Sequence, residues 1–325
     1  MKRRLKIFII VFIFIVVALI GLYIYMRLNM NMAEVAMFGN WDKVERMINN
    51  DADVNAKIRS NYAYIYTITN INDYLGLKDT MNNNNTFENV IFLRYISPIN
   101  ASVMSELSVL MMACADGKKE IVELLIDNEA DVNEESIHHG TPITLAVKSV
   151  NIEIAQILID NGADINTDAG LGSFTPLTYA SMFGDYEMAK FLIENGADVD
   201  MGQGNAPIVY AMFYDHFCIA KLIYSNISEF KYSNEERLIM SSYIGDFDEV
   251  RELVLDRKTD PNIRIRGFTP LSAALKSENL EIIDFLIDEG ADPNAIVKLP
   301  NMSLNDLEKG ISAKDYAKEK GIELD

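Results

Sequence analysis

The chain has few of the residues on which metal and disulfide sites depend. Its 325 residues include two cysteines, three histidines and one tryptophan. The histidines at positions 138, 139 and 216 have no Cys or acidic partners at the spacing of a known metal motif, so we expect no metal site. Cys114 and Cys218 are predicted to lie too far apart for a disulfide, and we interpret both as core residues.

Motifs of nucleotide-binding and hydrolytic enzymes are also missing. The sequence holds no G-x-x-x-x-G-K-[ST], G-x-S-x-G, H-E-x-x-H or G-x-G-x-x-G run. The glycine pairs at 170/172 and 202/204 are interpreted as turns between helical units, because Gly supplies positive φ there. We therefore expect no intrinsic catalysis and no bound cofactor.

Basic residues are scarce beyond the N-terminus. The formal net charge is −19, from 29 Lys and Arg against 48 Asp and Glu. Residues 1–27 hold five of the basic residues and no acidic ones, which leaves 24 basic against 48 acidic residues in the remainder. Nucleic acid is excluded as a partner, because its binding requires a positive surface that releases counterions. A basic protein partner would be attracted, although a soluble, hydrated surface is the simpler explanation of the acidity.

The N-terminus carries a long hydrophobic run. Residues 7–26 are twenty consecutive uncharged residues, all apolar or small, about the length that crosses ~30 Å of hydrocarbon. We expect a transmembrane helix that acts as a signal anchor, preceded by a basic cytoplasmic tip at residues 1–6. The positive-inside bias then leaves the rest of the chain on the extracytoplasmic side, which is the periplasm in a bacterium. A signal peptide cleaved after residues 16–18 is the alternative.

Two phrases recur down the rest of the chain. The first reads L-I-D-N-G-A-D-x-N or a close variant, and three of its endings lie 33 and 34 residues apart. Its endings are Asn133, Asn166, Asp200 and Asn294. The second, T-P-L-x-x-A or a variant, begins at Thr141, Thr175, Ala206 and Thr269. A fixed period in this range indicates helical units that stack and bury their apolar faces on one another.

Ordinary helix signals explain both phrases. Thr caps the first helix, and Pro occupies its first turn, where the missing N–H costs nothing. In the second helix, apolar residues recur three and four apart over residues 120–126, 153–159 and 281–287. Glycines at 162, 196 and 290 then stop the helix in the left-handed conformation. The repeat is therefore a helix–turn–helix unit.

This pattern, T-P-L-x-x-A followed by L-L-I-x-x-G-A-D-x-N, resembles the ankyrin repeat over about residues 30–325. The resemblance implies an all-α ankyrin-repeat solenoid with short β-hairpin loops, preceded by one transmembrane helix. We expect about seven repeats plus a C-terminal half-repeat that begins near Ser312. An insertion at about residues 56–105 interrupts the pattern, and its β-prone runs favour either an enlarged hairpin or a disordered loop.

The resemblance also implies where a partner binds. In ankyrin-like units, the two residues after the small pair of the first helix line a concave groove. In three consecutive units these positions hold large apolar residues, namely Met182, Phe183, Phe213, Tyr214, Tyr243 and Ile244. We predict that they form a strip that binds a helix or extended segment of a partner. The fourth to seventh units begin at about Gly172, Gly204, Asn234 and Arg266. The alternative is that the degenerate fifth and sixth units bend the stack and bury these side chains.

The sequence as a whole predicts a non-catalytic scaffold that is anchored to a membrane by its N-terminal helix and binds a protein partner. The sequence does not identify that partner. Two other roles are compatible with the same features. The protein could be a secreted ankyrin protein that acts on another cell after signal cleavage. It could also be an accessory subunit that holds or protects an enzyme.

Overall fold

The computed structural model describes residues 30–37, 39–57, 107–170, 172, 174–201, 206–227, 232–297 and 310–324. The chain divides into two compact units, Met1–Ala163 and Asp164–Asp325, which we call the N-terminal and C-terminal units. The expected span at residues 7–26 and most of the expected insertion lie outside the described residues. No helix within the described ranges is long and apolar enough to cross a membrane.

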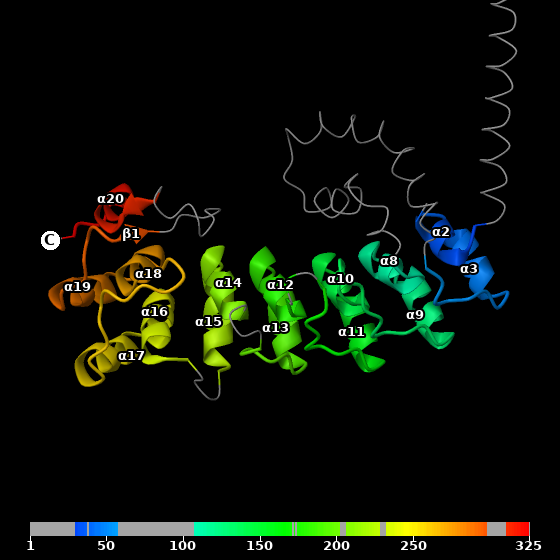
Figure 1. Cartoon of the computed structure of the whole chain (residues 1–325), viewed down its shortest axis with the longest axis horizontal. Coiled ribbons are helices and arrows are strands. Elements are labelled where there is room, and N and C mark those ends of the chain that lie inside the picture. The colour runs from blue at the N-terminus through cyan, green and yellow to red at the C-terminus, as the bar shows by residue number, and fades with distance from the viewer. Residues whose placement is uncertain are drawn as a thin grey trace, which may run out of the picture. The chain divides into compact units, whose positions relative to one another are not determined.

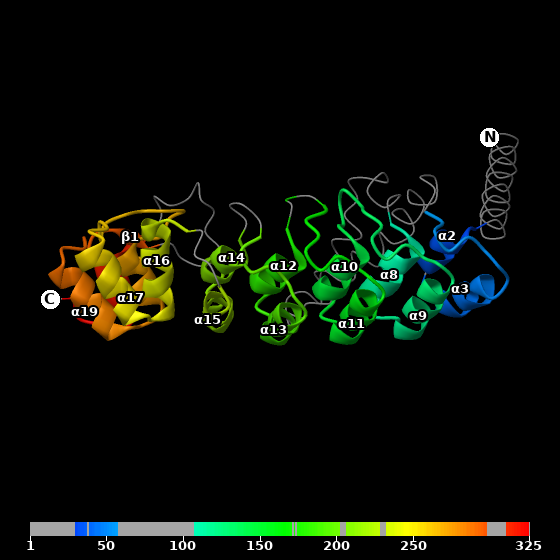
Figure 2. The ribbon, with the colours of Figure 1, turned by 90° about the horizontal axis from the view of Figure 1, so that it is seen from below.

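The described part of the N-terminal unit consists of helix pairs stacked in two layers (Figures 1 and 2). The pairs are α2 (Met32–Met37) with α3 (Trp41–Ile48), α8 (Val109–Ala115) with α9 (Lys119–Asp127), and α10 (Pro142–Lys148) with α11 (Ile152–Asp160). The first helices pack in the order α2, α8, α10, and the second helices in the order α3, α9, α11. Each pair thus covers the apolar face of its neighbour.

The C-terminal unit continues the same arrangement in its described residues. Its helices are α12 (Pro176–Phe183), α13 (Tyr186–Glu194), α14 (Pro207–Phe213), α15 (Phe217–Ser225), α16 (Asn234–Ile244), α17 (Phe247–Arg251), α18 (Pro270–Lys276), α19 (Leu280–Asp288) and α20 (Ala313–Glu319). A π-helical turn, η1 (Glu252–Asp256), follows α17 directly. Two short strands, β1 (Ile296–Val297) and β2 (Ile311–Ser312), pair antiparallel before α20. The result is the all-helical, ankyrin-type fold that the repeated phrases predict.

The Thr-Pro phrases begin helices in the way expected. The Thr175 hydroxyl accepts a hydrogen bond from the Thr178 N–H at 3.2 Å, and Pro follows at the first helical position. At α18 the bonds are reciprocal: Ser272 N–H donates to the Thr269 hydroxyl at 3.1 Å, and Thr269 N–H donates to the Ser272 hydroxyl at 2.8 Å. Such caps satisfy backbone donors that a helix leaves unpaired. Leu177, the second residue of α12, is then buried in the core.

The Asp-x-Asn endings join neighbouring repeats. Within one loop, the Asn262 N–H donates to Asp260 Oδ1 at 2.8 Å. Across to the next repeat, Asn262 Nδ2 donates to the Gly290 carbonyl at 2.8 Å, and its Oδ1 accepts the Asp292 N–H at 2.7 Å. Asn166 makes the same two contacts, with the Gly196 carbonyl and the Asp198 N–H, and the bond that its Nδ2 donates to Gly196 is the weaker one. These asparagines therefore hold their own turn and also link each loop to the next.

The insertion begins and ends at one point of the fold. Lys57 and Ser108 form an isolated antiparallel bridge, as Ser136 and Gly140 do in the next hairpin. The helices on either side of it still pack as neighbours, α2 on α8 and α3 on α9. The helices on either side of residues 58–106 therefore stack as successive repeats do.

The sixth unit contains one extra residue in its second helix. Asp246, which caps α17, is 14 positions from the loop residue Asp260, whereas Asn279, which caps α19, is 13 positions from Asp292. The extra residue is accommodated in η1, where the Arg257 N–H donates to the Glu252 carbonyl five residues back at 3.1 Å. A π-turn absorbs a one-residue insertion without changing the register of the following loop.

The last helix covers the end of the stack. Ser312 caps α20 through the Asp315 N–H at 3.1 Å, and Ala313 N–H donates to the Ala295 carbonyl at 2.8 Å. Ala313 and Ala317 are fully buried against the core formed by α18 and α19, and the charged side of α20 faces water. A terminal repeat of this kind shields the apolar face that a further repeat would cover.

Candidate functional site

The six side chains predicted to bind a partner differ in exposure. Tyr214, directly after α14, is 41% exposed. Met182 and Phe183, at the end of α12, and Phe213, at the end of α14, are half-buried. Tyr243 and Ile244, at the end of α16, are only 2% and 9% exposed. Four of the six positions therefore offer apolar surface, and two do not.

The expectation that Tyr243 and Ile244 face solvent is wrong, because both side chains are buried. The Tyr243 ring packs against Phe217 at the start of α15, with 5.9 Å between centroids. Burial, and then the nearby Asp215 carboxylate, raise the pKa of the Tyr243 hydroxyl above its usual value. Lys276 of the seventh unit forms an ion pair with Asp215 of the fifth and so spans the sixth. At this pair of positions, packing is the correct interpretation.

Six aromatic rings form a continuous strip in the C-terminal unit. In order of contact they are Phe183, Tyr179, Phe174, Tyr210, Phe213 and Phe268, with centroids 5.2–6.3 Å apart. Three of the contacts, Phe174 with Tyr179, Phe174 with Tyr210, and Phe213 with Phe268, are edge-to-face. We call this set the aromatic strip. Phe174, Phe183, Tyr210 and Phe213 are half-buried, so each shows part of its ring to solvent.

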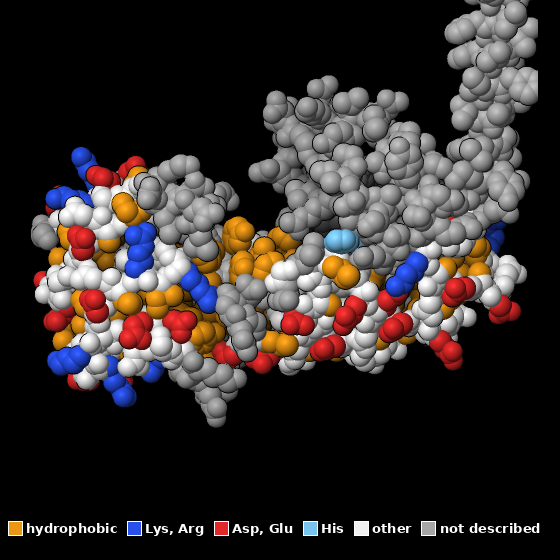
Figure 3. All heavy atoms as spheres, in the orientation of Figure 1, with side chains coloured by type: hydrophobic (Ala, Val, Ile, Leu, Met, Phe, Trp, Pro, Cys, Tyr) orange, Lys and Arg blue, Asp and Glu red, His pale blue; other side chains and the backbone are white. Residues whose placement is uncertain are grey.

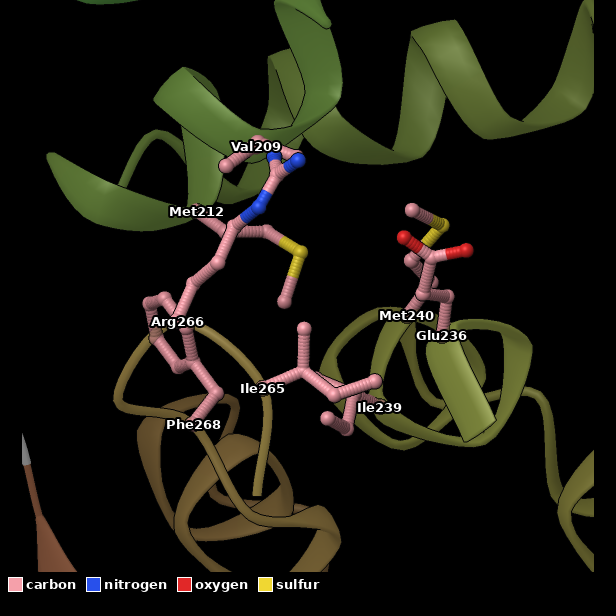
Figure 4. Close-up of a pocket in the computed structure, with 8 residues that line it drawn as sticks. All are labelled: Val209, Met212, Glu236, Ile239, Met240, Ile265, Arg266 and Phe268. Carbon is pink, nitrogen blue, oxygen red and sulfur yellow. The ribbon is translucent and has the colours of Figure 1, made fainter. Parts of the chain in front are cut away.

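The aromatic strip ends at a cleft between α14 and α16 (Figure 4). The lining residues are Val209 and Met212 from α14, Glu236, Ile239 and Met240 from α16, and Ile265, Arg266 and Phe268 from the loop before α18. Its cavity volume is about 30 Å³. The first helices α12 and α14 pack closely, as do α16 and α18, but α14 and α16 do not. Figure 3 shows hydrophobic side chains gathered on this face of the C-terminal unit.

Two models of known families match the chain. One, described as ankyrin repeats (3 copies), matches residues 80–169 and 168–234. The other, described as ankyrin repeat, matches residues 266–298. Together they cover more than half of the chain. The chain belongs to the ankyrin-repeat family.

Individual relatives cover the chain only in part. Alpha-latrocrustotoxin-Lt1a of Latrodectus tredecimguttatus is 38% identical to it over 66 residues, which are 20% of this chain and 5% of the toxin. This chain therefore matches only a small part of that relative's length. Among solved structures, the human ASB11 ankyrin repeat domain is similar with 24% identity and a TM-score of 0.41, covering 64% of this chain and 90% of that domain. Ankyrin repeats indicate a protein-protein interaction scaffold, with a protein partner that these comparisons do not name.

Sequence reasoning missed part of the aromatic strip of this ankyrin-repeat protein. Phe174 and Phe268 both stand directly before a Thr-Pro pair, and Tyr179 and Tyr210 occupy equivalent positions in the first helices of successive repeats. The shared F-T-P run was a usable signal, because the residue before the cap lies in the hairpin that adjoins the concave groove. These four residues lie outside the groove pairs, so a prediction based on the pairs does not include them.

His216 links the fourth and fifth repeats beside the aromatic strip. Its Nε2 lies 3.3 Å from the Met182 carbonyl, and its ring stacks on Tyr214 with 6.3 Å between centroids. Gly184 makes this approach possible, since a Cβ there would stand 2.5 Å from His216 Cε1 and φ is +77°. His216 therefore joins two successive repeats through this contact.

The charges around the aromatic strip are of both signs. Lys276 Nζ stands 5.6 Å from the centroid of Phe268, in addition to its ion pair with Asp215. Burial and the neighbouring Tyr214 raise the pKa of Tyr210, and the positive charge of Arg266 acts in the opposite direction. Lys276 is therefore attracted to the ring face of Phe268 as well as to the Asp215 carboxylate.

The other residues singled out in the sequence lie apart from this surface. Cys114 is buried in α8 as expected, but Cys218 on α15 is exposed, so its interpretation as a core residue is wrong. Within the described ranges, no three His, Cys, Asp or Glu side chains come together as a metal site requires.

Proposed function

We propose that this protein is a non-catalytic scaffold that holds a protein partner on the aromatic strip, together with Met182 and Tyr214. The observation that carries this proposal is the run of half-buried rings over the fourth and fifth repeats. Packing within the stack covers only part of four of the six rings, whereas Tyr179 and Phe268 are buried. Aromatic side chains are enriched at protein interfaces. A strip of this kind suits an apolar helix or extended segment.

Two tyrosines offer a matched test. Tyr214, beside the aromatic strip, is 41% exposed, and Tyr186, on the second helix α13, is 39% exposed. Partners are identified by cross-linking in cells and mass spectrometry with the full chain. We expect a partner that is captured by the wild type and by Tyr186→Ser but lost with Tyr214→Ser, while both variants unfold at the same temperature. Equal capture by both variants would contradict the proposal.

We also propose that residues 7–26 anchor the protein in a membrane, with the repeats on the extracytoplasmic side. The uncharged run of twenty residues and the basic residues before it support this arrangement. The test is the accessibility of a tag placed after Asp325 to protease in intact cells or spheroplasts, with a cytoplasmic protein as control. Digestion of a membrane-bound tag supports the proposal, and protection until lysis contradicts the orientation.

N-terminal sequencing of the mature chain tests the anchor itself. An intact N-terminus in the membrane fraction is expected. A mature chain that starts near Leu19 would favour the secreted form, because the span would then have been removed.

A further inference from the structure

Two opposite charges stand on the two sides of the cleft (Figure 4). Arg266 comes from the loop before α18, and Glu236 comes from the first turn of α16. Arg266 forms no hydrogen bond or ion pair with another described residue, although it is half-buried. One oxygen of Glu236 accepts the Ser233 N–H at 3.1 Å, and no described residue donates to the other. The two side chains do not pair with each other.

The floor of the cleft between these charges is apolar and adaptable. Met212, Ile239, Met240 and Phe268 are 3–5% exposed, so solvent reaches them only through the mouth. Methionine has a flexible, polarisable side chain that repacks around different occupants. The direct contact between α14 and α16 is small, and the two helices are joined mainly through α15.

The cleft is continuous with the aromatic strip. Phe268 lines the cleft and also meets Phe213 edge-to-face at 5.4 Å. A segment that lies on the strip would therefore pass over the mouth, between Arg266 and Glu236. An arginine with free donors binds a carboxylate through two parallel hydrogen bonds, and such charge-assisted bonds are roughly twice as strong as neutral ones.

We propose that the cleft binds one apolar side chain of the partner segment, with a carboxylate of that segment on Arg266 and a basic group on Glu236. This inference rests on the proposed function, since it describes the segment that the aromatic strip holds. The charge pattern fixes the direction of the segment, because a reversed segment would place like charges together. The recognised chemistry is an acidic, an apolar and a basic side chain in sequence along one face.

The test uses a displayed library of random peptides, selected on the purified full chain in detergent. Enriched peptides are then made with a fluorescent label and titrated against variants. Arg266→Glu changes the proposed contact, and Arg264→Glu is its matched control, because Arg264 lies in the same loop with an exposed side chain. Val209→Phe fills the cleft, and thermal unfolding of each variant shows whether it folds.

We expect enriched peptides to carry an apolar residue between an acidic and a basic one. Their affinity should fall about tenfold or more with Arg266→Glu and with Val209→Phe and stay unchanged with Arg264→Glu. A peptide in which the acidic residue is replaced by Lys should bind Arg266→Glu better than the original peptide does. If Val209→Phe does not fold, the Arg266 and Arg264 comparison decides alone.

Other outcomes separate the two proposals. Peptides that lose affinity with Tyr214→Ser but not with Arg266→Glu would overturn the assignment of the cleft and leave the aromatic strip in place. A library without enriched peptides, or peptides insensitive to both changes, would count against the strip as well. Self-association that Arg266→Glu abolishes, measured by analytical ultracentrifugation, would assign the cleft to a second copy of the chain and overturn the partner segment.

Discussion

Removing either partner of the ion pair between Asp215 and Lys276 should lower the stability of the C-terminal unit, but loss of Asp215 should cost much more than loss of Lys276. The Lys276 side chain is 2% exposed, whereas that of Asp215 is 31% exposed. Changing Asp215 to Asn leaves a buried ammonium without its counter-charge, which costs about 3–5 kcal/mol of unfolding free energy. Changing Lys276 to Met keeps the apolar stem against Phe268 and leaves Asp215 in reach of water. We expect that change to cost about 1 kcal/mol or less.

Asparagine is the suitable replacement at position 215, because φ there is 59° and Asn tolerates the left-handed region. Urea unfolding followed by circular dichroism measures the loss, and hydrogen exchange of α14, α16 and α18 shows where it falls. In the double variant Asp215→Asn/Lys276→Met no buried charge is left unpaired, so most of the loss should be recovered. The reasoning is refuted if Lys276→Met costs as much as Asp215→Asn.

Three further perturbations test the fold. Replacing residues 58–106 by a four-residue turn should raise the stability of the first two repeats by about 2 kcal/mol, because closing a shorter loop costs less entropy. A lower stability in urea unfolding would mean that the insertion packs on the stack. Asn262→Ala should lower the free energy of unfolding by about 1–2 kcal/mol, because it removes two hydrogen bonds to the next repeat. Asn161→Ala should cost clearly less, because the side-chain amide of Asn161 donates a hydrogen bond only within its own helix. Deleting Glu252 should convert η1 to α-helix at a cost below about 1 kcal/mol, because the spacing of 13 residues is restored; a cooperative loss of α17 in hydrogen exchange would contradict this.

Much of the fold can be predicted because its signals are local and repeated. Thr-Pro at a helix start, apolar residues at helical spacing and Gly after the second helix each act within one turn, and they agree across most units. Where one is missing, its neighbours still hold the conformation: Asp215 and Lys258 adopt positive φ where other units use Gly. Local patterns do not predict η1, because the apolar spacing on either side of a single inserted residue remains recognisable.

The candidate site was less predictable because exposure depends on contacts between units. Tyr243 and Ile244 occupy groove positions in their own repeat, but both are buried. The Tyr243 ring packs against Phe217 of the preceding unit, and an ion pair joins positions 215 and 276 across the sixth unit. Lys276 and Asp215 are 61 residues apart, and no periodic pattern in the sequence indicates that they form a contact.

The two units with weak repeat signals, the fifth and the sixth, supply the helices on either side of the cleft. The fifth unit begins with Ala206, which has no side-chain cap, and the sixth begins with a Ser capping box in place of Thr-Pro. Both changes occur at the junction where α14 and α16 fail to pack closely and the cleft opens. Departures from local rules that bring no gain in stability are expected where a protein needs a surface for another purpose. The apolar floor, the free guanidinium and the adjoining rings at this junction fit that explanation, whereas random drift of the repeat would have no reason to gather them in one place.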